Sequence, residues 1–410
     1  MKPRNLGLLA STILVSACGV GQLRTEAPLD LAAEARRIAA TSIIVDTHID
    51  VPIRLQEAPE DISVATENGQ FDYPRAKAGG LNAPFMSIYT AAALEAENRS
   101  RVVAESLIDM VEDFVRAAPE KFAIARSSAD VREHFSTGLM SLPMGMENGS
   151  PIEGDLANIE YFYNRGIRYI TLTHSLSNHL SDSSYDDNRQ WNGLSEFGVE
   201  VVKEMNRLGI MVDVSHVSDD AFWQVMDITD VPAIASHSSA RHFTPDFERN
   251  MSDAMIRRLA ENGGVIQINF GSSFVTAAAR AYSAARTEAG KAFRAEHPDK
   301  SSAELRAMYY PSFIAENGPY PYATVDDVLD HFDHVVSLVG VDHVGIGSDY
   351  DGVGDSLPIG LKDVSSYPSL IEGLLRRGYS EQDIRKILGE NLLRVWEAVA
   401  AHAERTTASR

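Results

Sequence analysis

The chain has 410 residues, of which 44% are hydrophobic, and a formal net charge of −21. This length allows about two or three domains, although an α/β barrel of about 250 residues or more also folds as one domain. The acidic balance, with no basic stripe, argues against nucleic-acid binding. The single cysteine, Cys18, excludes an intrachain disulfide and a cysteine-built zinc site.

The first residues have the form of a secretory signal. Two positive charges within Met1–Arg4 precede an apolar segment, Leu6–Val15, that is too short to span a membrane. The sequence Val15-Ser16-Ala17-Cys18 resembles a bacterial lipoprotein cleavage site, and an ordinary signal peptide is the alternative. We predict a signal peptide over 1–18, a tether over 19–35, and a lipid-anchored or periplasmic protein of the bacterial cell envelope.

From Leu31 onward, short apolar runs alternate with amphipathic segments. Period-2 or continuous apolar runs predict strands, and a period near 3.6 predicts helices. The predicted strands lie at 43–50, 82–89, 121–125, 140–147, 167–174, 210–216, 233–237, 264–270 and 343–348. The predicted helices lie at 31–41, 95–117, 155–165, 198–208, 219–228, 251–262, 324–339, 366–376 and 380–402. The stretch 272–323 is charged and Ala-rich, and we expect an irregular insertion or lid there.

The alternation of strands and helices predicts a parallel α/β fold. About eight such units fit between Ile43 and Ser348, which is the number that closes a barrel. A doubly wound open sheet is the alternative, but no Gly-x-Gly-x-x-Gly turn follows the first strand. We therefore predict a (β/α)8 TIM-like barrel over 36–402, with the 272–323 insertion and a C-terminal helical extension.

Several predicted strands end in a side chain that can bind a metal. In a barrel, the carboxyl ends of all strands converge on one face, so residues far apart in the chain meet there. Without cysteine, the donors are imidazole and carboxylate, which suits zinc, with manganese or cobalt as alternatives. The residues concerned are His48, Asp50, Glu147, His174, His216, His237 and Asp349.

Other polar residues are weaker candidates. His331 and His334 mimic a ligand pair on the predicted helix 324–339, but we expect both on its outer face. His343 precedes its strand and should lie at the opposite rim. Asp46, two residues before His48, could hydrogen-bond a ligand from behind. Loop residues that either line a substrate pocket or serve local structure are His179, His242, Tyr185, Trp191 and Asp351.

The arrangement of these residues resembles the membrane (renal-type) dipeptidase family, whose members are zinc peptidases with a metal-hydrolase (β/α)8 barrel. The likeness runs from about residue 36 to 400, in the family's order and spacing. The segments that carry it are Asp46-Thr47-His48-Ile49-Asp50, Glu147-Asn148-Gly149, Thr173-His174-Ser175, Asp213-Val214-Ser215-His216, Ser236-His237-Ser238-Ser239-Ala240, His343–Gly352 and Gly389–Val395.

The resemblance implies a centre of two zinc ions. His48 and Asp50 would hold the first ion and His216 and His237 the second, while Glu147 would bridge them and so take part in catalysis. Two such ions lower the pKa of a bound water from about 15.7 to near neutral, which yields a bridging hydroxide as nucleophile.

The resemblance also implies the groups that contact substrate. His174 would polarise the scissile carbonyl, and Asp349 would handle protons. Arg249, beside Asn250, would hold the terminal carboxylate of the substrate. Arg241 is the rival for that role, because the loop after His237 is one residue longer than the family form.

The predicted function is that of a zinc-dependent dipeptidase acting on small dipeptides. Another binuclear-metal hydrolase on the same barrel, such as a deacetylase, lactonase or phosphoesterase, is the alternative. A lipoprotein that only binds metal or peptide is disfavoured, because it would need neither His174 nor Asp349. The remaining expected partners are the membrane, through the lipid anchor, and a second copy of the chain, because relatives are often dimers.

Overall fold

Eight parallel strands succeed one another around a barrel, in the order β1-β2-β5-β6-β7-β8-β9-β10. A parallel bridge between Ile49 and Tyr350 joins the end of the first strand to the segment after the last. The predicted TIM-like barrel is confirmed. The strands are β1 (Ile44–Ile49), β2 (Leu81–Tyr89), β5 (Met144–Glu147), β6 (Ile167–Thr171), β7 (Met211–Asp213), β8 (Ile234–Ala235), β9 (Val265–Ile268) and β10 (Val344–Ile346).

This computed structural model describes Met1 and residues 30–408, and the predicted cleavage site at Cys18 lies outside the described residues. Helix α1 (Leu31–Thr41) opens the folded unit, and Ala35 is already fully buried on it. Residues 31–35, which we assigned to the tether, are therefore helical. No helix among the described residues is long and apolar enough to cross a bilayer.

A second, two-stranded sheet lies outside the barrel. It pairs β3 (Phe122–Ile124) with β4 (Met140–Leu142) in parallel. The single run predicted at 140–147 is thus divided at Pro143, because proline has no N–H to continue a ladder. Its first part joins β3, and its second part is β5, which carries Glu147.

Helices surround the barrel and close its amino end. Serine or threonine caps begin many of them; for example, the Ser195 and Ser218 side chains accept from the backbone N–H groups three residues on. The helices are α2 (Val51–Glu57), α3 (Tyr73–Gly79), α4 (Ala93–Ala96), α5 (Ser100–Ala117), α6 (Ser128–Thr137), α7 (Ala157–Asn164), α8 (Glu196–Leu208), α9 (Asp219–Ile228), α10 (Asp253–Glu261), α14 (Val325–Val339), α15 (Tyr367–Arg376), α16 (Glu381–Arg385) and α17 (Asn391–Ala408).

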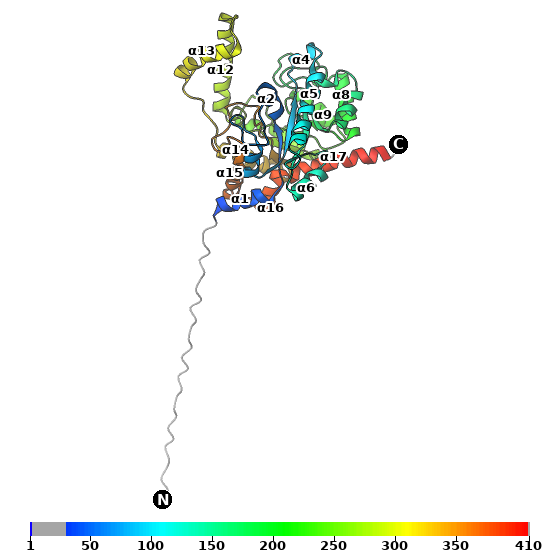
Figure 1. Cartoon of the computed structure of the whole chain (residues 1–410), viewed down its shortest axis with the longest axis vertical. Helices are drawn as coiled ribbons and strands as arrows, with labels where there is room; N and C mark the ends of the chain where they lie inside the picture. Colours follow the sequence, from blue (N-terminus) through cyan, green and yellow to red (C-terminus); the bar gives the residue numbers. More distant parts are fainter. Residues whose placement is uncertain (2–29, 409–410) are drawn as a thin grey trace. The chain divides into compact units, whose positions relative to one another are not determined.

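The C-terminal helix α17 packs against side chains that fill the barrel. Trp396 is buried with its ring 5.4 Å from that of Phe85, which in turn lies 5.4 Å from the ring of Tyr169 on β6. Figure 1 shows α17 passing under the strands. Helix α17 therefore fills the end of the barrel where the strands begin. The end where the strands finish is left for a polar site.

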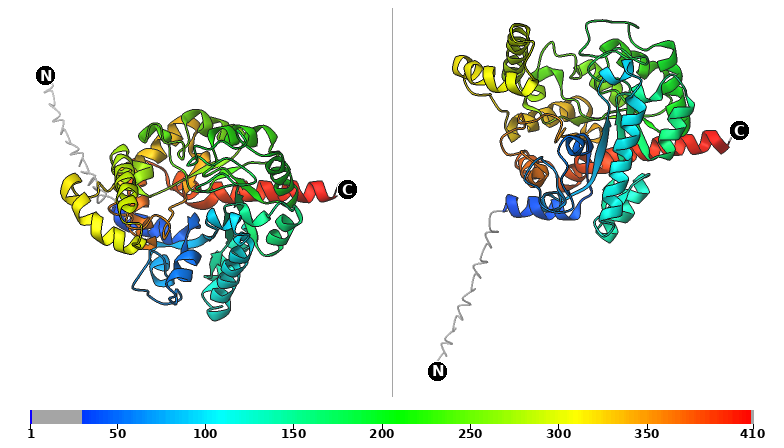
Figure 2. Two further views of the ribbon diagram at one scale, coloured as in Figure 1. Left: turned by 90° about the horizontal axis from the view of Figure 1, so that it is seen from above. Right: turned by 45° about the horizontal axis from the view of Figure 1, so that its top comes forward.

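The insertion is not irregular, contrary to our prediction. It contains α11 (Ser272–Val275), α12 (Ala277–Glu296) and α13 (Ser302–Asn317). The Ala-rich segment has high helix propensity, although its pattern does not show a core-facing stripe. A capping box at Ser301 and Glu304 begins α13. Figures 1 and 2 show α12 and α13 as a hairpin that projects from the body.

Candidate metal centre and active site

The carboxyl ends of the barrel strands bring the predicted residues together. His48 lies near the end of β1 and Asp50 directly after it, Glu147 ends β5, and the other residues follow their strands within three positions. A cavity of about 600 Å³ opens on this face. Its lining includes Asp50, Glu147, His174, His216, His237 and Asp349. Such a volume is within the usual range for small-molecule sites.

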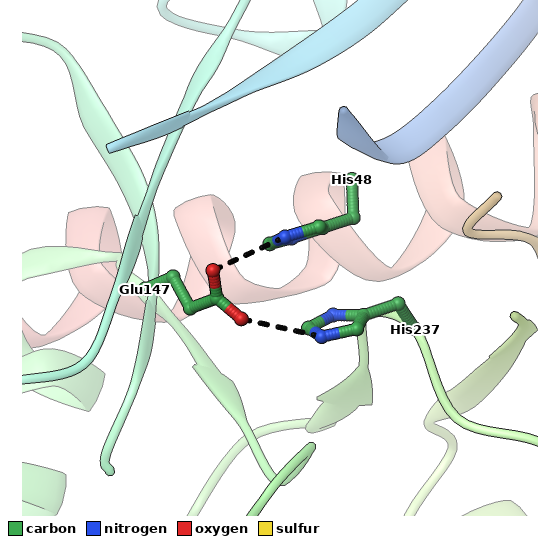
Figure 3. A group of neighbouring side chains, drawn as sticks. All are labelled: His48, Glu147 and His237. Carbon is green, nitrogen blue, oxygen red and sulfur yellow. Dashed lines mark ion pairs between the residues drawn. The ribbon is translucent and has the colours of Figure 1, made fainter. Parts of the chain in front are cut away.

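Glu147 lies at the centre of the cluster. One carboxylate oxygen, Oε2, is 3.3 Å from Nε2 of His48. The other, Oε1, is 3.1 Å from Nε2 of His216 and 3.4 Å from Nε2 of His237. Figure 3 shows the carboxylate between His48 and His237, with one oxygen directed at each ring. This is the arrangement in which one carboxylate can bind two cations.

The ring of His48 is oriented from inside the barrel. Tyr169 Oη lies 2.9 Å from Nδ1 of His48 and donates its only proton to the carbonyl of Thr47 at 3.0 Å. The tyrosine must then accept from Nδ1–H, which leaves the lone pair of Nε2 directed into the site. That Nε2 is buried, has no hydrogen-bond partner and lies 3.4 Å from Oδ2 of Asp50.

The ring of His237 is fixed in the same way. Ser236 Oγ lies 2.7 Å from Nδ1 of His237 and donates to Oδ2 of Asp213 at 2.6 Å. The serine therefore accepts from Nδ1–H, and Nε2 again presents a lone pair to the cavity. A metal-binding histidine almost always donates its second ring N–H to a hydrogen-bond acceptor, and the Ser236 hydroxyl is that acceptor here.

The remaining donors of the site fit a divalent cation. Nε2 of His216 lies 2.8 Å from Nε2 of His237 and accepts from Nη2 of Arg249 at 3.0 Å. Two lone pairs that face each other at this distance repel. The close approach of the two Nε2 atoms is therefore favourable only when both nitrogens bind a cation. Potential ligand atoms fall into three overlapping groups: His48, Glu147 and His237; Glu147, His174 and His216; and His48, Asp50 and Asp349.

The protonation of Glu147, His216 and His237 agrees with this. Burial opposes the charged form of Glu147, but the surrounding imidazoles outweigh it and hold its pKa well below the usual range. Burial, together with neighbouring cations that include Arg249, lowers the pKa of both His216 and His237 well below the ordinary value, so these rings are neutral. Neutral imidazole and ionised carboxylate are the metal-binding forms. At His48, burial is outweighed by neighbouring groups that include Glu147 and Asp50, which raise its pKa well above the ordinary value, so a bound cation would displace a proton there.

Asp349 differs from Glu147. Burial, and then the nearby charge of Asp50, raises the pKa of Asp349 to about 7, while a hydrogen bond from Asn269 at 2.8 Å acts in the opposite direction. A carboxyl with this pKa can hold and release a proton near neutral pH.

Arg249 lies beside the centre, and Arg241 does not. Arg249 is 3% exposed, with Nη1 bonded to Ser238 Oγ at 2.7 Å and Nη2 to the His237 carbonyl at 2.8 Å. Arg241 forms a bidentate pair with Asp219 at 2.6 and 2.7 Å. Its charge is thus already matched, away from the cavity.

Asn250 has no free group for a substrate. Its Oδ1 accepts from the Ser239 N–H at 3.1 Å, and its Nδ2 donates to Thr244 Oγ1 at 2.7 Å and to the Phe274 carbonyl at 2.8 Å. It is fully buried and holds in place the loop that carries Arg249.

We predicted that the two histidines of helix α14 lie on its outer face, and this prediction is wrong. His331 is fully buried, accepts from the Ala240 N–H at 3.0 Å and bonds the Val275 carbonyl at 3.0 Å. The insertion packs over this face of α14, which the helical pattern alone did not indicate. His334 is half-buried and pairs with Asp253 at 2.7 Å.

The other weak candidates separate into two groups. Tyr185 lines the cavity, whereas Trp191 bonds the Asn178 carbonyl and serves local packing. Away from the catalytic cavity, His179 pairs with Glu95, His242 stacks on His334, and His343 bonds the Gly264 carbonyl before β10. Asp351 lines the rim and pairs with Arg54 at 3.0 Å.

Asp46 acts on the main chain rather than on a liganding ring. Its Oδ1 accepts from the backbone N–H groups of His48 and Ser348, and its Oδ2 accepts from Tyr367 Oη at 2.6 Å. Sequence reasoning missed the residues that orient the rings, Tyr169, Ser236 and Asp213, and the partner of Asp349, Asn269. The sequence signal for Ser236 was its position next to a histidine at the end of a strand. For Tyr169 the only sequence signal was a position on its strand that faces the barrel interior.

A nearly closed (β/α)8 barrel with this imidazole and carboxylate cluster at its carboxyl face defines a metal-dependent hydrolase. Residues 32–410 match the family described as membrane dipeptidase, peptidase family M19. The chain belongs to this family and is a metallo-dipeptidase, as the resemblance implied.

Several relatives agree. An uncharacterised dipeptidase of Schizosaccharomyces pombe is 32% identical over 371 residues, covering 86% of this chain and 80% of that protein. The probable dipeptidase PvdM from Pseudomonas aeruginosa has a TM-score of 0.79 at 27% identity, covering 92% of this chain and 100% of the other. A metallopeptidase from Rhodobacter sphaeroides, solved with a phosphinate mimic of L-Ala-D-Ala, has a TM-score of 0.71 at 27% identity, covering 87% and 99%.

Proposed function

We propose that this protein is a two-zinc dipeptidase that hydrolyses small dipeptides by means of a bridging hydroxide. The proposal rests on the position of the Glu147 carboxylate, whose two oxygens face different imidazoles. Oε2 faces His48, and Oε1 faces His216 and His237. His48 and Asp50 would hold one ion, and His216 and His237 the other. Bound zinc supplies Lewis acidity and water of lowered pKa.

The chain's own side chains would position the dipeptide and move the proton. Arg249 would pair with the terminal carboxylate and thereby restrict substrates to short peptides, because a longer chain would bring an unpaired amide against this cation. His174, whose pKa is lowered by burial and then by Arg249, would donate a hydrogen bond to the scissile carbonyl as a neutral imidazole.

Asp349 would serve as the proton shuttle. It would take a proton from the attacking water and deliver it to the departing amine, which is a poor leaving group unless protonated. The hydrogen bond from Asn269 holds this carboxyl at the lining of the cavity, beside Asp50.

The Rhodobacter relative binds a mimic of L-Ala-D-Ala, which supports including dipeptides with a D-residue at the C-terminus in the proposed substrate range. We also propose that the protein is anchored to the bacterial cell envelope through lipidated Cys18 and that it forms a homodimer. Incorporation of labelled palmitate, lost in Cys18→Ala, would test the anchor, and sedimentation of the protein would test the dimer.

The function is tested by release of free amino acids from a dipeptide panel. Hydrolysis should be abolished by a chelator and restored by zinc, with about two zinc ions bound per chain. Turnover of a phosphoester or lactone in the absence of dipeptide hydrolysis would contradict the proposal and support the alternative hydrolase.

A further inference from the structure

A second cavity, of about 530 Å³, lies between helices α12 and α13 and the loop 353–356. Its lining contains four cationic side chains, those of Arg286, Lys291, Arg294 and Arg306, and one carboxylate, that of Asp355. This local excess of positive charge is opposite in sign to the net charge of −21 of the whole chain.

The two helices of the hairpin approach each other closely beside this cavity. Arg286, Gly290 and Arg294 recur every four residues and so share one face of α12. A Cβ atom at Gly290 would lie 3.3 Å from Tyr309 Oη on α13, so glycine permits the close approach of the two helices here. The cations lie along the seam formed by this approach.

Arg286 is held in place by aromatic side chains rather than by a carboxylate. Its Nη1 donates to Tyr310 Oη at 3.2 Å, and its guanidinium lies 5.7 Å from the ring centre of Tyr310 and 5.9 Å from that of Tyr320. Tyr309 Oη donates to the Arg286 carbonyl at 2.8 Å. The arginine is therefore ordered while its charge stays available.

The negative side chains nearby neutralise the cavity only in part. Lys291 pairs with Glu288 at 2.8 Å, whereas among the described residues no carboxylate forms an ion pair with Arg286 or Arg306, so these two arginines carry the charge that matters here. Asp355 accepts from Tyr322 Oη at 2.8 Å and lies 3.7 Å from Nζ of Lys362, so another cation already matches it.

The cationic cavity is next to the catalytic cavity. Gly352 and Val353 line the catalytic cavity, and Val353, Gly354, Asp355 and Ser356 line the cationic one, so Val353 borders both. In Figure 1 the hairpin lies in the upper part of the body, as does α2, and α1 and α16 lie at the bottom. An anion drawn to the hairpin therefore arrives beside the mouth of the active site.

We propose that the α12–α13 cavity receives a second carboxylate on the substrate, so that dipeptides with an acidic side chain are preferred over neutral ones. This rests on the proposed dipeptidase function and specifies its substrate class. A chain with a large negative net charge repels anionic substrates in general, and a local cationic cluster reverses that effect at one entrance. The preference is electrostatic and weakens as salt is added.

The test compares Asp-Ala with Ala-Ala as substrates of the zinc-loaded enzyme. The double variant Arg286→Gln/Arg306→Gln should lose about tenfold in kcat/KM for Asp-Ala, through KM, and keep kcat/KM for Ala-Ala. The parent's preference for Asp-Ala should fall as salt rises. Arg116→Gln/Lys203→Gln removes the same charge from helices α5 and α8, outside the lining of either cavity, and should leave the preference unchanged.

Three outcomes would overturn the proposal: no preference for Asp-Ala in the parent, an equal loss on both substrates, or the same loss in the control variant. If the zinc-loaded parent cleaves neither dipeptide, the proposed function fails, and calorimetric binding of Asp-Ala decides separately about the cavity. Weaker binding to the double variant than to the control would support the cavity, and equal binding would contradict it.

Discussion

The hydroxyl oxygen of Tyr169 lies 2.9 Å from Nδ1 of His48 and fixes which ring nitrogen faces the metal centre. The two residues come from β6 and β1, so the bond crosses the filled interior of the barrel. Both side chains are fully buried. The strand β1 places His48 at the metal centre, and the packed interior of the barrel orients its ring.

Tyr169→Phe should weaken zinc binding by about 10- to 100-fold, because the second partner of a liganding imidazole is lost. The fold should persist, since the ring volume is kept. Zinc retention against a competing chelator is the measurement, with the half-exposed Tyr161→Phe as control. Unchanged retention in Tyr169→Phe would show that the bond has no part in orienting His48.

Ser236→Ala should produce a similar loss at the other imidazole. It removes the hydroxyl that links Asp213 to Nδ1 of His237, and so frees the tautomer of that ring. Because His48 is unaffected, we expect one tightly and one weakly held zinc ion per chain in a titration. Two equally tight ions would be inconsistent with this role.

The sequence predicted the barrel and the members of the cluster because both follow from position along a strand. A side chain at the carboxyl end of any barrel strand reaches the same face, whatever the details of packing. The orientation of the rings could not be predicted in this way. It depends on which residue lies opposite, as Tyr169 does for His48, and that is set by strand register and stagger.

The same distinction explains why the outer-face prediction for His331 was wrong. It was made from a local pattern that describes a helix surface. Tertiary contacts decide its burial, since α11 and the His237 loop cover His331 through the carbonyl of Val275 and the N–H of Ala240.

Asp349→Asn should lower kcat by about 10²- to 10⁴-fold, the usual contribution of a proton-transfer group. Asparagine keeps the size of the side chain but cannot shuttle a proton. The measurement is steady-state kinetics at saturating zinc, with zinc content checked in parallel. If activity falls only in proportion to lost zinc, Asp349 is a ligand rather than a proton carrier.

His331 should make the stability of the protein depend on pH. Burial lowers its pKa from 6.5 to about 4, so between these values the unfolded chain binds a proton that the folded chain does not. Its contribution is complete above pH 6.5 and is lost as the pH falls toward 4. The pKa difference of about 2.5 units corresponds to about 3 kcal/mol.

Urea unfolding at pH 7 and pH 4.5, at one zinc concentration, would measure this contribution. The loss of unfolding free energy on acidification should be smaller in His331→Gln than in the parent. The half-exposed His402→Gln should behave as the parent does. Equal pH dependence in His331→Gln and the parent would exclude His331 as the source.

Substitution of Arg249 should lower kcat/KM, whereas substitution of Arg241 should lower the melting temperature. Arg249→Gln removes a cation beside the imidazoles, and loss of a charged hydrogen bond of about 1.5–3 kcal/mol should lower kcat/KM for Ala-Ala by about 10- to 100-fold. Lysine at 249 should restore only part of this, since it lacks the planar fork. Because Arg249 also contacts His216, zinc content must be shown to match the parent.

Arg241→Gln breaks the ion pair with Asp219 and should lower the melting temperature while leaving KM unchanged. A raised KM in Arg241→Gln, with Arg249→Gln normal, would assign the substrate carboxylate to Arg241 instead.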